Sequence, residues 1–340
     1  MGISITDVAK QAGVSIATVS KVLNQTEGSR IGTATRERIM QVVATTGYQP
    51  SRVASALARR RSNMIGIMVS GLENPFFVMV MEALERRVTA RGYQVMLDAA
   101  PATLGTYLEH GKIRGWAVDG VLMWAHKKEF ASHYLGPVAH EVPVIYLGSQ
   151  RGPEDEWAGF DYEAVGRLAV EHLVTRGYRR ITFVTPHIAS DGRPSEGRYW
   201  GCLAQACEHG ADFDLWTIPD HRATREAAYQ AGREIARSLA PGEGRAFVCH
   251  NDIIALGAIH GIRGAGRRVP EDAAVIGFDG IEEGRYQDIP LTTIEFDIDK
   301  MADVAVERLM ALLAGEAKGR LGALAPYRLR EGLTTRGRIR

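Results

Sequence analysis

The chain has 340 residues, of which 45% are hydrophobic, enough for about two or three globular units with cores of their own. No apolar run approaches the ~18 residues that a membrane helix needs, and the first residues lack the apolar stretch of a signal peptide, so we expect a cytoplasmic protein. The three cysteines are odd in number and show no C-x-x-C spacing, so neither a disulfide framework nor a zinc site is expected.

Charge is unevenly distributed along the chain. Residues 1–61 contain nine Lys or Arg and three acidic residues, a net charge of +6, whereas the remainder has 32 basic residues against 37 acidic ones. A basic segment on a mildly acidic body predicts a polyanionic partner for that segment alone. A solvated basic tail would be poor in apolar residues, and this segment is not, so we expect it to fold.

The first two predicted helices are short and close together. Ser4 and Asp7 have the spacing of a capping box, and Gly13 ends the helix that follows. Ser15 caps a second helix with an inner apolar stripe, formed by Val19, Val22 and Leu23. Two short helices joined by a turn that contains glycine make a helix-turn-helix. A third helix over 37–46 closes a small core, to which it contributes Ile39, Val42 and Val43.

The outer face of the second helix has small residues, hydroxyl groups and one lysine. In a helix-turn-helix this helix enters the major groove with its N-terminus first, and its first residues meet base edges. Ile16 and Ala17 allow a close approach and suit thymine methyl groups, and Lys21 reaches a guanine edge or a phosphate. Four polar side chains can bond to flanking phosphates: Ser15, Thr18, Ser20 and Asn24. The alternative is that Ser15 only caps the helix and Thr18 only packs.

The stretch ITDVAKQAGVSIATVSKVLN, followed by TRERI and GYQPSRVASALARRRS, resembles the N-terminal domain of the lactose/galactose repressor (LacI/GalR) family of bacterial transcription factors. The resemblance implies that Ile16, Ala17 and Lys21 read bases, and we add Tyr48 to the candidate DNA contacts. One departure is that the third helix starts at Gly32-Thr33, where the family usually has a serine cap.

Residues 50–61 are expected to form a hinge helix. Pro50-Ser51 is a helix start signal, but a helix of about eight residues is not stable alone in water. The residues by themselves also fit an Arg-rich, partly helical linker. The resemblance implies that two such helices, one from each protomer, fold together in the operator minor groove, where Leu57 wedges into the central base step. Arg52 and the arginines at 59–61 would then neutralise phosphates.

The body, residues 62–340, alternates apolar strand-like runs with helical patterns. The strand-like runs are 64–69, 93–97, 118–123, 142–147, 180–184, 246–249 and 273–278, and the helical segments include 75–91, 164–176, 196–208 and 299–314. This pattern predicts parallel sheets covered on both faces, arranged as two doubly wound α/β lobes. Ligands in such sheets bind at the carboxyl ends of strands, so the default site is the cleft between the lobes.

The resemblance extends over almost the whole body, which is similar to the effector-binding core shared with periplasmic sugar-binding proteins. Its landmarks are 74–77, 118–120, the arginine and glycine of 198–201, 251–257, 277–279 and 290–294. They imply a chain that crosses between the lobes three times. Arg198, Asn251 and Asp279 fall where the family contacts its effector, and an arginine, an amide and a carboxylate suit a polyhydroxylated ligand.

Further effector candidates are Phe76, Trp124, which could stack on a sugar face, and Asp161. Alternatives stay open, because Arg198 and Asp279 could form a structural ion pair and Trp124 could belong to the core. Where several family members have an acidic pocket residue after the fourth strand, this chain has Gly148. Three residues cannot be assigned a role from the sequence: Arg193, Trp216 and His221.

The sequence therefore predicts an all-α helix-turn-helix head (1–49), a hinge helix (50–61) and a two-lobed, periplasmic-binding-protein-like α/β body for effector binding and dimerisation (62–340). We expect a cytoplasmic, nucleoid-associated repressor without cofactor or metal. It binds a double-stranded, pseudopalindromic operator as a homodimer and responds to a small molecule, a sugar or sugar derivative. The alternatives are a corepressor-dependent regulator with a non-sugar effector, or a sugar-processing enzyme with a DNA-binding head. Against an enzyme, GIRGAG at 261–266 is an incomplete dinucleotide motif that follows a helix.

Overall fold

A computed structural model describes residues 3–23, 31–48, 61–99, 118–124, 142–186, 194, 196–219, 224–240 and 244–337. The chain divides into two compact units, Met1–Ser62 and Asn63–Arg340. Residues 50–60 of the predicted hinge, Arg52 and Leu57 among them, lie outside the described residues, so the hinge helix and the exact domain boundaries stay predictions. No helix in the described ranges is long and apolar enough to cross a bilayer.

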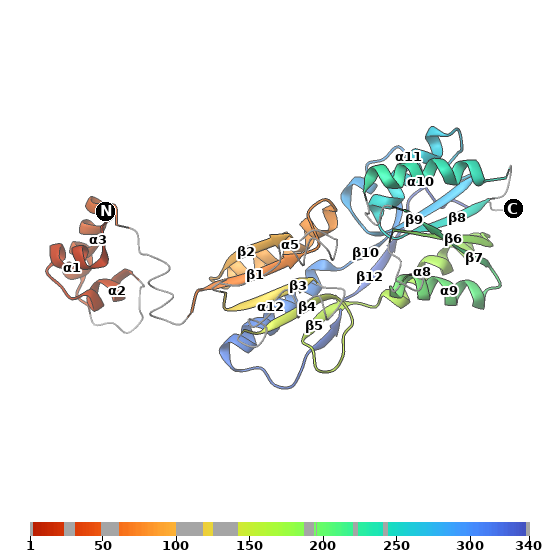
Figure 1. Cartoon of the computed structure of the whole chain (residues 1–340). Coiled ribbons are helices and arrows are strands. Elements are labelled where there is room, and N and C mark those ends of the chain that lie inside the picture. Colours follow the sequence, from red (N-terminus) through yellow and green to blue (C-terminus); the bar gives the residue numbers. More distant parts are fainter. Residues whose placement is uncertain are drawn as a thin grey trace. The chain divides into compact units, whose positions relative to one another are not determined.

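The first unit contains three helices in its described part, α1 (Ile5–Ala12), α2 (Ile16–Leu23) and α3 (Thr33–Thr46) (Figure 1). The capping box of α1 is confirmed, because the backbone N of Asp7 donates to Ser4 Oγ (3.3 Å) and the backbone N of Ser4 donates to Asp7 Oδ2 (2.9 Å). Helix α3 is longer than the predicted 37–46 and starts at Gly32-Thr33, as the comparison with the family motif predicted. It begins after Gly32, whose carbonyl oxygen accepts from Thr35 N (3.0 Å), so the backbone starts the helix without a side-chain cap.

Seven buried residues form the core of the head in its described part: Val8, Ala9, Ala12, Val19, Val22, Ile39 and Tyr48. The partly buried Leu23, Val42 and Val43 pack against them. This confirms the predicted inner stripe of α2 and the contribution of α3. Because the apolar stripe of α2 faces this core, its opposite side is left for solvent or a partner.

The second unit contains two sheets, each with six strands among the described residues. The order in the first is β11 (Gly322–Leu324), β5 (Trp157–Phe160), β4 (Val144–Ser149), β3 (Gly120–Trp124), β1 (Met64–Val69) and β2 (Gln94–Ala99). The order in the second is β12 (Tyr327–Arg330), β10 (Thr292–Phe296), β9 (Ala273–Asp279), β8 (Arg245–Cys249), β6 (Arg180–Thr185) and β7 (Asp212–Thr217). Of the neighbouring pairs, β10–β12 is antiparallel and the others are parallel, so the prediction of two parallel-sheet lobes is confirmed.

Helices cover these sheets (Figure 1). On the first sheet α5 (Pro75–Ala90) packs beside α12 (Ile298–Ala314), and the second sheet is covered by two pairs, α8 (Tyr162–Thr175) with α9 (Gly197–Glu208) and α10 (Arg225–Ser238) with α11 (Asp252–Gly264). The two pairs lie on opposite faces. In β8, Ala246 and Val248 belong to one apolar cluster and Phe247 and Cys249 to the other, as the alternation of side chains along a strand requires.

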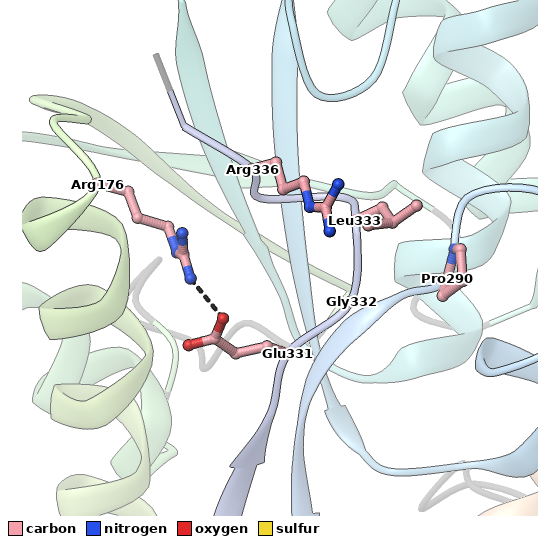
Figure 2. Close-up of a pocket in the computed structure, with 6 residues that line it drawn as sticks. All are labelled: Arg176, Pro290, Glu331, Gly332, Leu333 and Arg336. Carbon is pink, nitrogen blue, oxygen red and sulfur yellow. Dashed lines mark hydrogen bonds and ion pairs between the residues drawn. The ribbon is translucent and has the colours of Figure 1, made fainter. Parts of the chain in front are cut away.

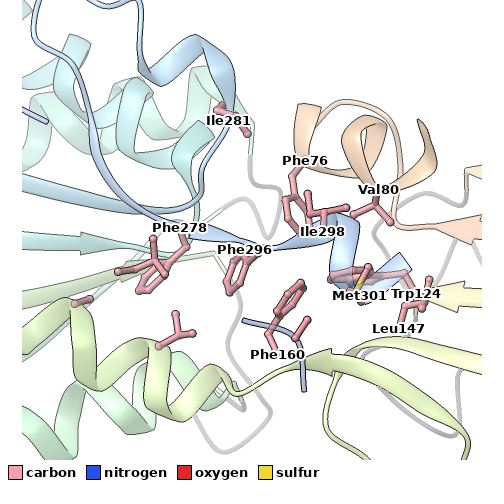
Figure 3. Packing of buried hydrophobic residues seen from close by; sticks show 14 of the residues in the cluster. Phe76, Val80, Trp124, Leu147, Phe160, Phe278, Ile281, Phe296, Ile298 and Met301 are labelled. Atoms are coloured by element: carbon pink, nitrogen blue, oxygen red, sulfur yellow. The ribbon is translucent and has the colours of Figure 1, made fainter. Parts of the chain in front are cut away.

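The chain crosses between the lobes three times, as predicted: from β5 to α8, from β10 to α12 and from β11 to β12. The crossings are bonded to one another, since Ala325 N donates to Gly159 O (2.7 Å) and Asp297 N donates to Pro326 O (2.9 Å). Aromatic rings pack where they meet, with the Phe160 and Phe296 ring centres 4.5 Å apart (Figure 3). One apolar core therefore runs from the first lobe through the crossings into the second.

Candidate functional site

The outer face of α2 is exposed, as a DNA-reading face has to be. Ile16 is 46% exposed although it is a large apolar residue, and Ala17 and Lys21 are exposed beside it. Ser15 caps the helix, because Thr18 N donates to Ser15 Oγ (3.1 Å). Packing of the opposite face against the head core explains why these side chains point outward. Their individual contacts with DNA stay predictions.

The other predicted DNA contacts have mixed positions. Thr18 is half-buried, and its hydroxyl lies 2.9 Å from Ser15 Oγ. This contact fits the alternative that Ser15 only caps the helix and Thr18 only packs. Ser20 is half-buried too. Tyr48 is 9% exposed and packs in the head core, so its contact with DNA stays a prediction. Asn24, Arg52 and Leu57 lie outside the described residues.

In the second lobe, polar side chains gather where β6, β8 and β9 end. We call Glu196, Arg198, His250, Asn251 and Asp279 the strand-end cluster. His250 and Asn251 follow β8 directly, Asp279 is the last residue of β9, and Arg198 lies in the first turn of α9. Arg198, Asn251 and Asp279 are buried at 6%, 6% and 5% exposure, so the three effector candidates are brought to one edge of one sheet. The carboxyl ends of parallel strands are where open α/β sheets bind ligands.

Glu196, Arg198 and His250 form a closed ring of hydrogen bonds. Arg198 donates from Nε to Glu196 Oε2 (3.0 Å), and its Nη2 lies 2.9 Å from the same oxygen and 3.3 Å from His250 Nε2. His250 Nδ1 closes the ring, 2.7 Å from Glu196 Oε1. Arg198 also donates from Nη1 to the backbone oxygen of His250 (2.8 Å). Arg198 therefore forms its ion pair with Glu196. It does not form the structural ion pair with Asp279 that the sequence left open as an alternative.

Burial shifts the pKa values in this cluster. It lowers the pKa of His250, although Glu196 acts in the opposite direction, so the imidazole is neutral near pH 7. Burial is the largest single effect on Arg198 and opposes its charge, but Glu196, Tyr162 and Asp279 together outweigh it, so the pKa of Arg198 is raised. The Arg198 guanidinium carbon lies 4.9 Å from the ring centre of Tyr162 and 5.5 Å from that of Phe278, which adds cation–π stabilisation.

Asn251 is held by a backbone group of a helix end, and Asp279 is held by a residue of the other lobe. Asn251 Oδ1 accepts from Ile254 N (2.9 Å), so this amide caps α11. Asp279 Oδ2 accepts from Asn74 Nδ2 (3.0 Å), and Asn74 belongs to the first lobe. Burial raises the pKa of Asp279 to about 7 against the pull of Arg198, and it also raises the pKa of the neighbouring Asp252. Asp252 is fully buried and its two oxygens accept from Thr293 Oγ1 (2.6 Å) and Ile281 N (2.9 Å).

Phe76 and Trp124 belong to the core of the first lobe. They are 3% and 2% exposed, and their ring centres lie 5.4 Å apart in an edge-to-face contact (Figure 3). This is the alternative that the sequence left open for Trp124, and stacking of either ring on a ligand stays a prediction. Asp161 is half-buried and caps α8 by accepting from Ala164 N (3.0 Å). Its contact with a ligand is likewise a prediction.

Trp124 also explains why Gly148 stands where several family members have an acidic residue. Gly148 has a φ of 97°, and a Cβ built on it would lie 2.7 Å from two atoms of the Trp124 ring. A side chain at this position would displace the tryptophan. The glycine at position 148 is therefore coupled to the presence of the large Trp124 ring at the end of β3.

A separate cavity of about 380 Å³ lies beside the end of α8 and the beginning of β10 (Figure 2). It is lined by Arg176, Pro290, Glu331, Gly332, Leu333 and Arg336. Two of these lining residues form an ion pair, with Arg176 Nη2 2.5 Å from Glu331 Oε2 (Figure 2). None of the predicted site residues lines this cavity, so it is distinct from the strand-end cluster. Of the unassigned residues, Trp216 is half-buried in β7, and Arg193 and His221 lie outside the described residues.

Sequence reasoning missed Glu196 and His250 as site residues. His250 could have been found, because it follows a predicted strand and stands next to Asn251. Glu196 carried a weaker signal, since it lies two residues before Arg198 at the start of a helix in a stretch that does not align with the family. Its role depends on α9 and β8 meeting in space, which no local pattern reports.

Comparisons with known proteins agree with this architecture. Residues 4–51 match the family model for bacterial regulatory proteins of the lacI family, and residues 170–335 match a periplasmic binding protein-like domain. The HTH-type transcriptional repressor PurR of Mannheimia succiniciproducens is 30% identical over 317 residues, 92% of each chain. The HTH-type transcriptional regulator CelR of Thermobifida fusca is 29% identical over 323 residues, 91% of each chain.

Solved structures show the same likeness. A lac repressor dimer bound to operator and the anti-inducer ONPF has a TM-score of 0.80 and 26% identity, covering 98% of this chain and 99% of that one. A LacI family transcriptional regulator from Arthrobacter sp. FB24 in complex with lactose has a TM-score of 0.66 and 27% identity, covering 80% of this chain and 98% of that one. These relatives are regulators, as predicted, and the chain belongs to the lacI family of bacterial regulatory proteins as a DNA-binding transcriptional regulator.

Proposed function

We propose that this regulator is a repressor that binds a pseudopalindromic operator as a homodimer, with α2 of each protomer in the major groove. The observation that carries the proposal is the exposed trio of Ile16, Ala17 and Lys21 on α2, in a head segment with a net charge of +6 over residues 1–61. Two heads on two half-sites require two-fold symmetry. The solved lac repressor dimer on its operator supports this arrangement.

The proposed effector is a sugar or sugar derivative that binds at the strand-end cluster. Asp279 supports this, because its Oδ2 is bonded to Asn74 among the described residues and Oδ1 is left to accept from a ligand hydroxyl. The lactose complex of the Arthrobacter regulator supports a carbohydrate. We further propose that the protein acts on chromosomal DNA in the cytoplasm.

In vitro selection from random duplexes, followed by fluorescence anisotropy, tests the operator. We expect a consensus of two inverted half-sites, and an asymmetric consensus or no enrichment would contradict the proposal. Titration of the selected duplex with lactose, cellobiose and monosaccharides then tests the effector class. Release identifies an inducer and tightening a corepressor, and chromatography should recover the sugar unchanged. A response to none of the sugars would favour the non-sugar alternative.

The oligomeric state and the hinge have tests of their own. Light scattering should give twice the chain mass of 37.2 kDa, because the sequence shows no leucine heptads for a tetramerising coiled coil. A tetramer mass would contradict this. If Leu57 wedges into the minor groove, Leu57→Ala should lose about 1–3 kcal/mol of operator affinity with an unchanged melting temperature.

A further inference from the structure

The hydrogen-bonded ring of Glu196, Arg198 and His250 in the strand-end cluster contains a carboxylate that is not used as a helix cap. Glu196 stands at the N-cap position of α9, yet its side chain makes no capping hydrogen bond. It turns instead to Arg198 and His250, and its side chain is only 16% exposed. Thr185 Oγ1, at the end of β6, lies 3.5 Å from Glu196 Oε1. Three elements therefore hold this carboxylate inside the cluster.

The distances fix a consistent set of donors and acceptors. Glu196 can only accept, so His250 Nδ1, 2.7 Å away, carries the hydrogen. In a neutral imidazole Nε2 is then the acceptor, and Arg198 Nη2 donates to it at 3.3 Å. The lowered pKa of His250, caused first by burial, agrees with the neutral ring. The ring of three residues therefore has one positive charge, one negative charge and no net charge.

The ring occupies the edge of Arg198 that would hold an anion. A guanidinium binds a carboxylate or phosphate through two parallel N–H groups. Here Nε and Nη2 face Glu196, Nη2 also reaches His250, and Nη1 donates to a backbone oxygen. An anionic ligand at this edge would have to compete with Glu196 for the same N–H groups. Glu196 has the advantage because it belongs to the chain, and its negative charge would also repel the ligand. A neutral hydroxyl faces no such repulsion.

We propose that Glu196 and His250 are specificity-determining residues that make the strand-end cluster reject anionic ligands and accept uncharged ones. This inference rests on the proposed role of the cluster as the effector site. It narrows that role to uncharged sugars, such as the neutral disaccharides, and excludes sugar phosphates and sugar acids at this point. Arg198 acts as a packed, neutralised scaffold for His250 and as a latent anion site that Glu196 keeps closed.

Sulfate at matched ionic strength is a probe that does not require the effector to be known. The full chain should show only the general stabilisation that sulfate gives to folded proteins when it replaces chloride. Glu196→Gln removes the competing charge while keeping an acceptor, so we expect it to bind sulfate at least tenfold more tightly than the parent. The double variant Glu196→Gln/Arg198→Lys should lose that gain, because a lysine cannot supply two parallel N–H groups.

The matched control is Glu163→Gln, which removes a carboxylate from the neighbouring helix α8 where the side chain is 59% exposed. It should leave the sulfate response at the parental level. A Glu196→Gln variant that folds and shows no gain would overturn the proposal. If that variant does not fold, the parent protein still provides a test. Sulfate binding by the parent that is abolished by Arg198→Lys would also overturn the proposal.

The parent also provides a direct comparison of matched ligands. Any hexose that stabilises the full chain should do so at least tenfold more strongly than its uronate or its 6-phosphate, and the reverse order would contradict the proposal. These outcomes are separable from failure of the proposed function. A chain that selects no symmetric duplex would contradict operator binding while leaving the sulfate result intact.

Discussion

Asn74 Nδ2 donates to Asp279 Oδ2 at 3.0 Å, and this bond joins the beginning of α5 in the first lobe to the end of β9 in the second. The amide of Asn74 has a fixed orientation, because its Oδ1 accepts from Phe76 N (3.0 Å) as the cap of α5. A second bond between the lobes runs from Arg225 Nη1 to Glu73 O (3.4 Å). A ligand that bonds to Asp279 therefore acts on a residue that already connects the two lobes, which is the differential contact that a ligand-driven rearrangement needs.

We expect Asp279→Asn to change how stability depends on pH. Burial raises the pKa of Asp279 to about 7, above the ordinary value near 4, so folding takes up a proton between these pH values. The contribution of Asp279 is therefore present at low pH and lost as pH rises through about 7. The asparagine variant has no such loss, and its free energy of unfolding relative to the parent should be higher at pH 8 than at pH 5 by about 1–3 kcal/mol.

Urea denaturation at the two pH values measures this difference. Asp288→Asn is the control, because that side chain is 87% exposed. The same parent-to-variant difference at pH 5 and pH 8 would contradict the assignment. The variant should also respond more weakly to effector, since an amide oxygen is a weaker acceptor than a carboxylate.

His172 predicts a pH dependence of the opposite sign. Burial, followed by the charge of Arg176, lowers the pKa of this histidine to about 4, and its Nε2 lies 2.8 Å from Thr335 Oγ1. Unfolding restores a pKa near 6.5, so the unfolded state binds the proton first as pH falls. The free energy of unfolding of the parent should therefore fall by about 1–3 kcal/mol more than that of His172→Gln between pH 7 and pH 4.5.

Thermal melts across this range test the second pH prediction. The exposed His209, whose side chain is 38% exposed, supplies the control variant His209→Gln, which should follow the parent. Identical pH profiles for the parent and His172→Gln would show that the buried imidazole does not carry the effect.

Gly201 determines how closely α9 approaches α8. A Cβ built on Gly201 would collide with the backbone oxygen of Glu163, and this crossing also positions Arg198, whose backbone oxygen lies against Gly166. We expect Gly201→Ala to lower the free energy of unfolding by about 1–3 kcal/mol, because the two helices must separate. Gly264→Ala on α11 is the control, since the nearest atom to its Cβ would be Tyr229 Oη at 3.4 Å. Urea denaturation should show the control at or slightly above parental stability, and equal losses for both variants would contradict the packing argument.

Buried parallel strands were predictable because they are continuous apolar runs with helices between them. All seven predicted runs overlap a strand, and β1 coincides with the predicted 64–69. Two of the strands absent from the prediction lack that signal. β7 (Asp212–Thr217) alternates polar and apolar residues at the edge of its sheet, and β11 (Gly322–Leu324) has three residues whose pairing depends on β5 arriving beside it.

The candidate site was predictable only in part, for a related reason. Arg198, Asn251 and Asp279 are marked by family motifs, and the structure brings them to one sheet edge. Their bonding partners are set by tertiary packing. Glu196 meets His250 across 54 positions of sequence, and Asn74 meets Asp279 across 205, so no local pattern reports either contact.

The last prediction separates two roles that geometry allows for Lys21. Its side chain is exposed on α2 beside Ala17, within reach of either a guanine edge or a phosphate. If Lys21 contacts a phosphate, Lys21→Ala should weaken binding to all duplexes alike and reduce the slope of log K against log salt by about 1. If it reads a base, the variant should lose about 1–3 kcal/mol on the selected operator and relax specificity at one position of each half-site. Anisotropy titrations on the operator and on single-base variants, each at several salt concentrations, distinguish the two. Lys300→Ala, which removes an exposed lysine from α12 of the body, is the control and should match the parent. Unchanged affinity and salt slope for Lys21→Ala would mean that α2 does not present its outer face to DNA.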